Sequence, residues 1–330
     1  MSERDERRQL AETWAAGELG WSSWDSEAVS SDASFRRYFR LSHQGTSKVV
    51  MDAPPERENT RPFIDIGSRL ARTGVHVPEV PAHDPHQGFV LLEDLGSTPY
   101  HHVLANANAD QLFGDAVDAL IRFQLDADTG GLPDYDPALL MRELGLFPDW
   151  FLARHWHVEP TDSELDAWDM VCATLIRWAL DQPQVFCHRD YMPRNLLVAD
   201  PNPGIIDFQD AVRGPISYDP VSLYRDAFLS WPAERVDDWL ENYRRQALAG
   251  GLPVPEDPDL WRRTCDFMGV QRHLKVIGIF ARIRYRDGKS RYLEDAPRFF
   301  TYLAQAIARN PELGELGHLL QEWRHRARRE

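Results

Sequence analysis

The sequence predicts an α+β fold of two lobes, with a small β-rich lobe over residues 1–96 and a large, mostly helical lobe over residues 97–330. Strand-like apolar runs gather before residue 96, whereas amphipathic helical patterns dominate after it. A length of 330 residues with 43% hydrophobic content is enough to give each lobe its own core. We therefore expect the boundary near Gly96.

In the small lobe, residues 1–20 favour an amphipathic helix with Leu10, Trp14 and Leu19 on its apolar side. Residues 30–51 predict a turn and a β-ribbon, residues 60–73 a helix, and residues 88–93 a strand. In the large lobe, helices are expected over residues 110–126, 142–155, 163–180 and 271–282. The last of these is expected to present a solvated polar face that includes Gln271, Arg272 and Lys275.

The stretch from Val185 to Asp210 carries the chemistry. Two apolar runs flank a turn rich in Pro, Asn and Gly, which predicts a β-hairpin. Asp190 and Asn195 then lie before its first strand and Asp207 at the end of its second, so we expect the three side chains to converge. His-Arg-Asp, four residues, Asn, and later Asp-Phe form the catalytic and metal loops of protein kinases.

This pattern predicts a protein-kinase-like two-lobed fold that transfers a phosphoryl group. Asp190 orients and deprotonates the acceptor hydroxyl, while Asn195 and Asp207 supply the oxygen ligands that Mg²⁺ prefers. A plain hairpin with solvated polar ends is the alternative. Asp219 either caps the helix that follows it or braces the catalytic loop.

The small lobe departs from the kinase pattern in two ways. Asp52 stands where protein kinases place the lysine that holds the phosphates of ATP. The preceding ribbon also lacks a glycine-rich phosphate loop, so Ser34, Arg36 and Arg37 are the candidates to hold the nucleotide. An exposed basic hairpin edge is an equal alternative for this segment.

Composition narrows the class of protein. A net charge of −15 argues against broad nucleic-acid binding. The chain has no apolar run long enough to span a bilayer, and its first residues are charged rather than apolar, so we expect a soluble cytoplasmic protein. The three cysteines show no metal-binding spacing and are expected to be buried thiols. We also expect a monomer.

The catalytic stretch and the Glu-Asp-Leu-Gly segment resemble the aminoglycoside phosphotransferase/choline kinase family of small-molecule kinases. More narrowly, four groups of segments resemble its anomeric N-acetylmuramate/N-acetylglucosamine kinases of bacterial cell-wall recycling. They are residues 32–40 with 51–55, residues 91–96, residues 206–211 with 214–215, and residues 271–281. Those kinases also lack the lysine, so Asp52 need not mean that the chain is inactive.

The resemblance implies ATP and Mg²⁺ as cofactors and an amino sugar as the acceptor, converted to its α-1-phosphate. The adenine is expected at the segment that joins the lobes, at Glu93 and Leu95, and Arg194 is a candidate to neutralise the phosphoryl group. The candidates for sugar contact are Gln209, Arg272, His273 and Lys275.

Two other functions stay open. An aminoglycoside kinase would favour an acidic acceptor pocket, with which the net charge of −15 is compatible. Against it, the segment from Arg262 onward holds 15 Lys and Arg but 8 Asp and Glu, and the lactyl carboxylate of N-acetylmuramate would pair with an arginine. A nucleotide-binding pseudokinase would explain Asp52 but not the presence of Asp190, Asn195 and Asp207 together.

Overall fold

The computed structural model describes residues 3–30 and 35–328 and divides the chain into two compact units. The first unit consists of Met1–Ala127 and Pro193–Asp210, and the second of Asp128–Met192 and Ala211–Glu330. The region around Gly96 therefore lies inside the first unit, and the lobe boundary near Gly96 stays a prediction. Among the described residues, no helix is both long enough and apolar enough to cross a lipid bilayer.

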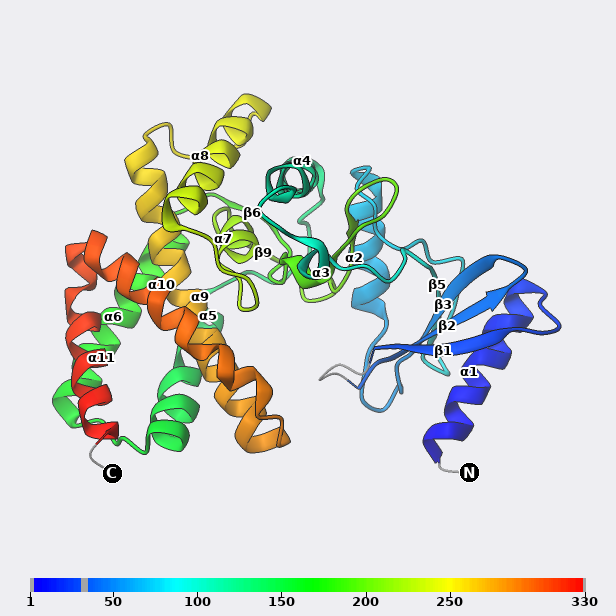
Figure 1. The fold of residues 1–330 in the computed structure, drawn as a ribbon, viewed down its shortest axis with the longest axis horizontal. Coiled ribbons are helices and arrows are strands. Elements are labelled where there is room, and N and C mark those ends of the chain that lie inside the picture. Colours follow the sequence, from blue (N-terminus) through cyan, green and yellow to red (C-terminus); the bar gives the residue numbers. More distant parts are fainter. Residues whose placement is uncertain (1–2, 31–34, 329–330) are drawn as a thin grey trace. The chain divides into compact units, whose positions relative to one another are not determined.

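The first unit is built on an antiparallel sheet of five strands in the order β1-β2-β3-β5-β4 (Figure 1). The strands are β1 (Asp25–Ser30), β2 (Arg37–His43), β3 (Thr46–Asp52), β4 (Ala82–Asp84) and β5 (Phe89–Glu93). Strands β2 and β3 pair from Arg37 opposite Asp52 to His43 opposite Thr46. The predicted ribbon is confirmed over these residues.

Helix α1 (Glu3–Leu19) packs against this sheet. Ala11 and Ala15 are fully buried in a cluster with residues of β2, β3 and β5, and Trp14 and Leu19 pack against the same cluster, as predicted. The prediction for Leu10 is wrong, since its side chain is 58% exposed. Successive helical residues point about 100° apart, so a stripe through Ala11 and Ala15 turns Leu10 toward solvent.

The remaining elements of the first unit are α2 (Arg61–Arg72), α3 (Tyr100–Val103), α4 (Ala109–Asp126), and the hairpin of β7 (Leu196–Leu197) and β8 (Gly204–Ile205). The pairing of Leu196 with Ile205 confirms the predicted hairpin. Its turn is anchored by Asn202, whose side-chain amide donates to the Tyr100 hydroxyl and to the Asp115 carboxylate, each at 2.7 Å.

The second unit is mostly helical and is organised around the 30-residue helix α9 (Pro258–Asp287). Its other helices are α5 (Pro137–Leu146), α6 (Asp162–Leu180), α7 (Tyr218–Tyr224), α8 (Ala233–Gly250), α10 (Ala296–Arg309) and α11 (Gly314–Ala327). A two-stranded sheet pairs β6 (Gln184–Cys187) with β9 (Val212–Pro215). Figure 1 shows α5, α6 and α10 beside α9. All three cysteines are buried and free, as predicted.

The helix predicted over residues 142–155 has different bounds. It begins at Pro137 as α5, and from Phe147 to Trp156 the backbone continues as a π-helix. Helix α9 passes very close to this junction: a Cβ on Gly278 would lie 2.4 Å from the carbonyl carbon of Leu146. Only glycine fits such an approach, so the packing of α9 here depends on Gly278.

The polar face predicted for α9 is not solvated. Gln271, Arg272 and Lys275 are exposed by 0%, 3% and 8% respectively. The expectation was wrong because the residues that cover this face, such as Glu143 against Gln271 and Lys275, come from distant parts of the sequence that a helical pattern does not reveal.

Candidate active site

The predicted catalytic aspartate follows β6 in the second unit. Strand β6 ends at Cys187, and Arg189 then adopts the left-handed backbone conformation, with φ of 72°. A positive φ is uncommon for a residue other than glycine and occurs often at functional sites. The backbone N–H of Asp190 donates to Nδ1 of His188 at 3.3 Å, and Asp190 itself is half-buried. The turn at Arg189 therefore sets the direction of the Asp190 side chain.

Asp219, at the start of α7, braces this loop through its side chain. Its carboxylate accepts hydrogen bonds from the backbone N–H groups of His188 at 2.7 Å and Arg189 at 2.9 Å. Complete burial raises the pKa of Asp219 to about 7, although both of these hydrogen bonds favour the ionised form. The bracing role is thereby confirmed. The capping role is wrong, because the residue before α7 is Ser217 and Asp219 lies within the first turn.

A second buried carboxylate, Glu143 of α5, holds the side chains around the loop. It accepts from the Arg189 guanidinium, the Tyr135 hydroxyl, the Lys275 ammonium at 2.8 Å and the Gln271 amide at 3.2 Å. Burial alone would raise the pKa of Glu143, but the charges of Lys275 and Arg189 lower it to about 2. Glu143 is therefore an anion that ties α5, α9 and the catalytic loop together.

In the first unit, the two predicted metal ligands lie side by side. The side-chain nitrogen of Asn195 is 3.4 Å from Oδ2 of Asp207, and Asp207 has a positive φ of 64°. Gln209 donates to the other carboxylate oxygen of Asp207 at 2.9 Å. No group of three or more His, Cys, Asp or Glu side chains forms a metal site in residues 3–30 and 35–328.

This donor set nevertheless fits Mg²⁺. One carboxylate and one amide oxygen match an ion that takes one or two carboxylates and completes its shell with water and phosphate oxygens. Asp190 belongs to the second unit and this pair to the first, so their convergence stays a prediction.

The residues predicted to hold the nucleotide are all in the first unit. Ser34 lies outside the described residues. Arg36 has its Nε 4.0 Å from a carboxylate oxygen of Glu58, and Arg37 is hydrogen-bonded to Asp52, with 3.0 Å between its Nε and Oδ2. Their role toward ATP stays a prediction.

Glu93 and Leu95 lie at the end of β5. One carboxylate oxygen of Glu93 is 3.4 Å from Nε2 of His76, and Leu95 is 8% exposed. Between them, Asp94 makes a two-pronged contact with Arg40 at 2.6 and 2.9 Å, which fixes this segment to β2. Arg194, near the β7–β8 hairpin, is half-buried. Burial lowers the pKa of His101 to about 4, and the charges of His102 and Arg194 add to this effect.

Asp52, which replaces the kinase lysine, does not present an isolated negative charge. It is fully buried and pairs with Arg37 and with Arg7 of α1, whose Nε lies 2.8 Å from Oδ1. Two cationic side chains therefore gather at the position where protein kinases carry one.

Three of the four sugar candidates lie on α9. Lys275 forms an ion pair with Glu143 and donates a hydrogen bond to the Tyr218 hydroxyl at 3.0 Å. The negative groups around Lys275, Glu143 among them, raise its pKa against the effect of burial. His273 packs against the rings of Phe299 and Tyr302, with centroids 5.2 and 5.1 Å away. The contacts of all four candidates with a sugar stay predictions.

Glu143 was not foreseen as a functional residue. It lies on a helix that was predicted, but its partners follow it by 46 residues at Arg189 and by 128 at Gln271. No short motif links such positions, so only the folded chain reveals the cluster.

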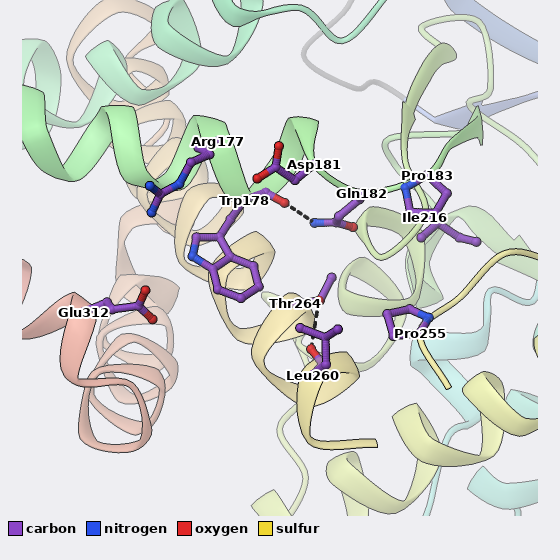
Figure 2. Close-up of a pocket in the computed structure, with 10 residues that line it drawn as sticks. All are labelled: Arg177, Trp178, Asp181, Gln182, Pro183, Ile216, Pro255, Leu260, Thr264 and Glu312. Carbon is purple, nitrogen blue, oxygen red and sulfur yellow. Dashed lines mark hydrogen bonds between the residues drawn. The ribbon is translucent and has the colours of Figure 1, made fainter. Parts of the chain in front are cut away.

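A cavity of about 510 Å³ lies elsewhere in the second unit (Figure 2). Trp178 and Gln182 line it beside the end of α6, and Leu260 and Thr264 line it from α9. Gln182 donates to the Trp178 carbonyl at 3.0 Å. Because none of the predicted site residues lines this cavity, it does not contribute to the candidate active site.

Comparison with known proteins gives the family and the fold. The sequence profile of the phosphotransferase enzyme family matches residues 25–267. A protein named N-acetylmuramate/N-acetylglucosamine kinase from Pseudomonas aeruginosa is 57% identical over 88% of this chain and 86% of its own length. A protein of the same name from Pseudomonas putida is 51% identical over 99% of this chain and 100% of its own.

Among solved structures, an aminoglycoside phosphotransferase with bound ADP is similar, with a TM-score of 0.60 and 16% identity over 90% of this chain and 99% of its own. At such low identity the likeness shows the fold alone. The predicted α+β, protein-kinase-like fold is confirmed, as is the family resemblance.

Proposed function

The chain belongs to the phosphotransferase enzyme family, and from this premise we propose that it transfers the γ-phosphoryl group of ATP to the anomeric hydroxyl of N-acetylmuramate and N-acetylglucosamine. The high identity over nearly the whole chain to kinases named for these two sugars carries the proposal. The α-1-phosphate product would enter the recycling of cell-wall sugars. A reaction that consumes ATP and a free sugar is expected in the cytoplasm, and a monomer is expected to perform it.

Asp190 is the catalytic base of this proposal. In phosphoryl transfer a carboxylate orients the attacking hydroxyl and accepts its proton. The brace at Asp219 and the anchor of Arg189 at Glu143 both support this role, because they fix the loop immediately before Asp190. A base held in this way loses little orientational freedom when the sugar binds.

Asn195 and Asp207 would hold Mg²⁺, which when bound neutralises charge on the phosphate oxygens of ATP. Gln209 orients the Asp207 carboxylate through the hydrogen bond to its second oxygen. Arg194 is proposed to neutralise the transferring phosphoryl group. Gln209, Arg272, His273 and Lys275 remain the candidates for the sugar side, and Lys275 is restricted by its ion pair with Glu143.

In the first unit, the backbone at Glu93 and Leu95 is proposed to bind the adenine, and Ser34, Arg36 and Arg37 the phosphates. The pairing of Asp52 with Arg7 and Arg37 supports an active enzyme over a pseudokinase. Neutralised in this way, the Asp52 carboxylate does not repel a nucleotide as an isolated charge would.

The test is turnover of ATP by the purified protein with Mg²⁺ and, in parallel, N-acetylmuramate, N-acetylglucosamine, glucose or kanamycin. A phosphorus coupling to the anomeric proton of the two N-acetylated sugars, seen by NMR of the product, is the expected result. Phosphorylated kanamycin alone would move the chain to the antibiotic-modifying enzymes. ATP binding without turnover of any acceptor would favour a pseudokinase.

A further inference from the structure

Three arginines are buried in the described part of the chain, and one of them differs from the others. Arg225 donates to the Asp266 carboxylate at 2.9 Å and to the Cys265 carbonyl at 3.3 Å. Arg244 donates to Glu241 and to the carbonyls of residues 255 and 256. Arg272, only 3% exposed, has its Nε and Nη1 buried without any hydrogen-bond partner among residues 3–30 and 35–328.

Such an arrangement is costly for a cation. A guanidinium carries five donors and stays charged, so burying two of its nitrogens without acceptors costs hydration that no hydrogen bond replaces. The Tyr218 ring offers a cation–π contact, but its centroid is 6.0 Å from Cζ, at the limit of that interaction. An unsatisfied buried group of this kind calls for a ligand or another explanation.

One group near Arg272 is polar and similarly unsatisfied. Asp226 Oδ2 is buried without a hydrogen-bond partner among the described residues. Burial raises the pKa of Asp226 to about 6, and the charge of Arg272 opposes this rise, so the two side chains lie within electrostatic range. Donor and acceptor groups that lack hydrogen-bond partners favour a polar ligand over an apolar one.

The position of Arg272 relates it to the catalytic loop inside the same unit. The Tyr218 ring is near both Arg272 and Lys275, and the Nζ of Lys275 is 5.6 Å from the ring centre. Lys275 in turn shares the Glu143 carboxylate with Arg189, the residue before Asp190. Arg272 is therefore connected to the residue before Asp190 through Tyr218, Lys275 and Glu143, all within the second unit.

We propose that Arg272 binds the carboxylate of an acidic amino sugar, and so makes the enzyme select the sugar that carries a lactyl group over the one that does not. This inference rests on the proposed function. Guanidinium and carboxylate form paired hydrogen bonds, the geometry that arginine provides and lysine does not. N-acetylmuramate differs from N-acetylglucosamine by this one substituent, which carries the negative charge.

The experiment compares kcat/KM for three acceptors: N-acetylmuramate, its neutral lactyl amide, and N-acetylglucosamine. The wild-type protein is expected to favour the acid over the amide. In Arg272→Gln, kcat/KM for N-acetylmuramate should fall roughly tenfold to a hundredfold, the worth of a hydrogen bond to a charged group. In the same variant, kcat/KM for N-acetylglucosamine should change by less than about threefold, which is clearly smaller than the fall expected for N-acetylmuramate.

Arg282→Gln is the matched control. It removes a half-buried arginine of the same helix whose Nε also lacks a hydrogen-bond partner in the described part of the chain. It should leave the preference between the two sugars unchanged.

Equal loss on both sugars in Arg272→Gln would show a structural role and overturn the inference. Equal kcat/KM for the acid and the amide in the wild-type protein would overturn it without any variant. Failure of the proposed function has a different signature, since the wild-type protein would then phosphorylate neither sugar, and the inference would fall with it.

Discussion

Glu143 and Lys275 form a buried ion pair, with 2.8 Å between Oε1 and Nζ, on two helices that lie more than a hundred residues apart in the sequence. The same carboxylate also pairs with Arg189 of the catalytic loop. One anion therefore serves two buried cations. Removing it leaves both without a counter-charge, whereas removing either cation leaves the other in place.

We predict that Glu143→Gln destabilises the protein by about 3–5 kcal/mol, the cost of leaving a buried partner charge uncompensated. Chemical denaturation measures the change. The control is Glu312→Gln, which breaks an exposed ion pair with Arg263 and should cost less than about 1 kcal/mol. A loss in Glu143→Gln no larger than in the control would contradict the role assigned to Glu143.

The contribution of Glu143 should depend on pH. Its pKa in the folded protein, about 2, lies below the value of an unfolded glutamate, because the charges of Lys275 and Arg189 outweigh burial. The stabilisation is therefore fully present above the unfolded pKa and is lost as the pH falls through the folded one. The difference in unfolding free energy between the wild-type protein and Glu143→Gln should narrow from pH 6 to pH 3. A constant difference would mean that Glu143 is not ionised in the folded state.

Local patterns were sufficient to predict most elements and the catalytic stretch. The hairpin of β7 and β8 follows from two apolar runs around a turn, and the ribbon of β2 and β3 from the same signal. Both hairpins depend on neighbours in sequence, which a pattern records. The bracing role of Asp219 spans about 30 residues, and it could be named as one of two alternatives only because related folds carry an acid there.

The features that were missed depend on distant partners. Gln271 and Lys275 look like one polar face of a helix, yet both point at Glu143 on another helix. Leu10 looks like a core residue until the small side chains of Ala11 and Ala15 define the contact. A helical pattern reports which residues share a face but does not report what covers that face.

Asp219→Asn tests the brace. One acceptor oxygen becomes a donor that faces a backbone N–H of His188 or Arg189, so the loop must shift. We expect kcat to fall on the order of a hundredfold, as for a small misplacement of a catalytic group, with the KM for ATP nearly unchanged. Steady-state kinetics measure both. Asp238→Asn, at an exposed position on α8, is the control and should leave kcat unaltered. A variant of Asp219 with wild-type kcat would remove it from the mechanism.

Asp52→Asn tests whether the buried carboxylate organises the arginines of the first unit. Loss of its charge weakens the contacts to Arg7 and Arg37, and the expected destabilisation is about 2 kcal/mol, measured by denaturation. If Arg37 contributes to phosphate binding, the KM for ATP rises in the same variant. Asp65→Asn breaks an exposed pair with Arg69 and should affect neither quantity. An unchanged KM in Asp52→Asn would argue that Arg37 serves the fold alone.

Asp190→Asn separates catalysis from binding. An amide keeps the size of the side chain but cannot accept the proton of the sugar hydroxyl, so turnover should fall by at least about a hundredfold. Binding of ATP, measured by calorimetry, should remain, because the residues assigned to ATP and Mg²⁺ lie in the first unit and Asp190 in the second. Asp207→Asn should show the opposite pattern, with weakened nucleotide affinity in Mg²⁺ and a higher Mg²⁺ requirement. Turnover that survives in Asp190→Asn would require another base, and equal behaviour of the two variants would contradict their separate roles.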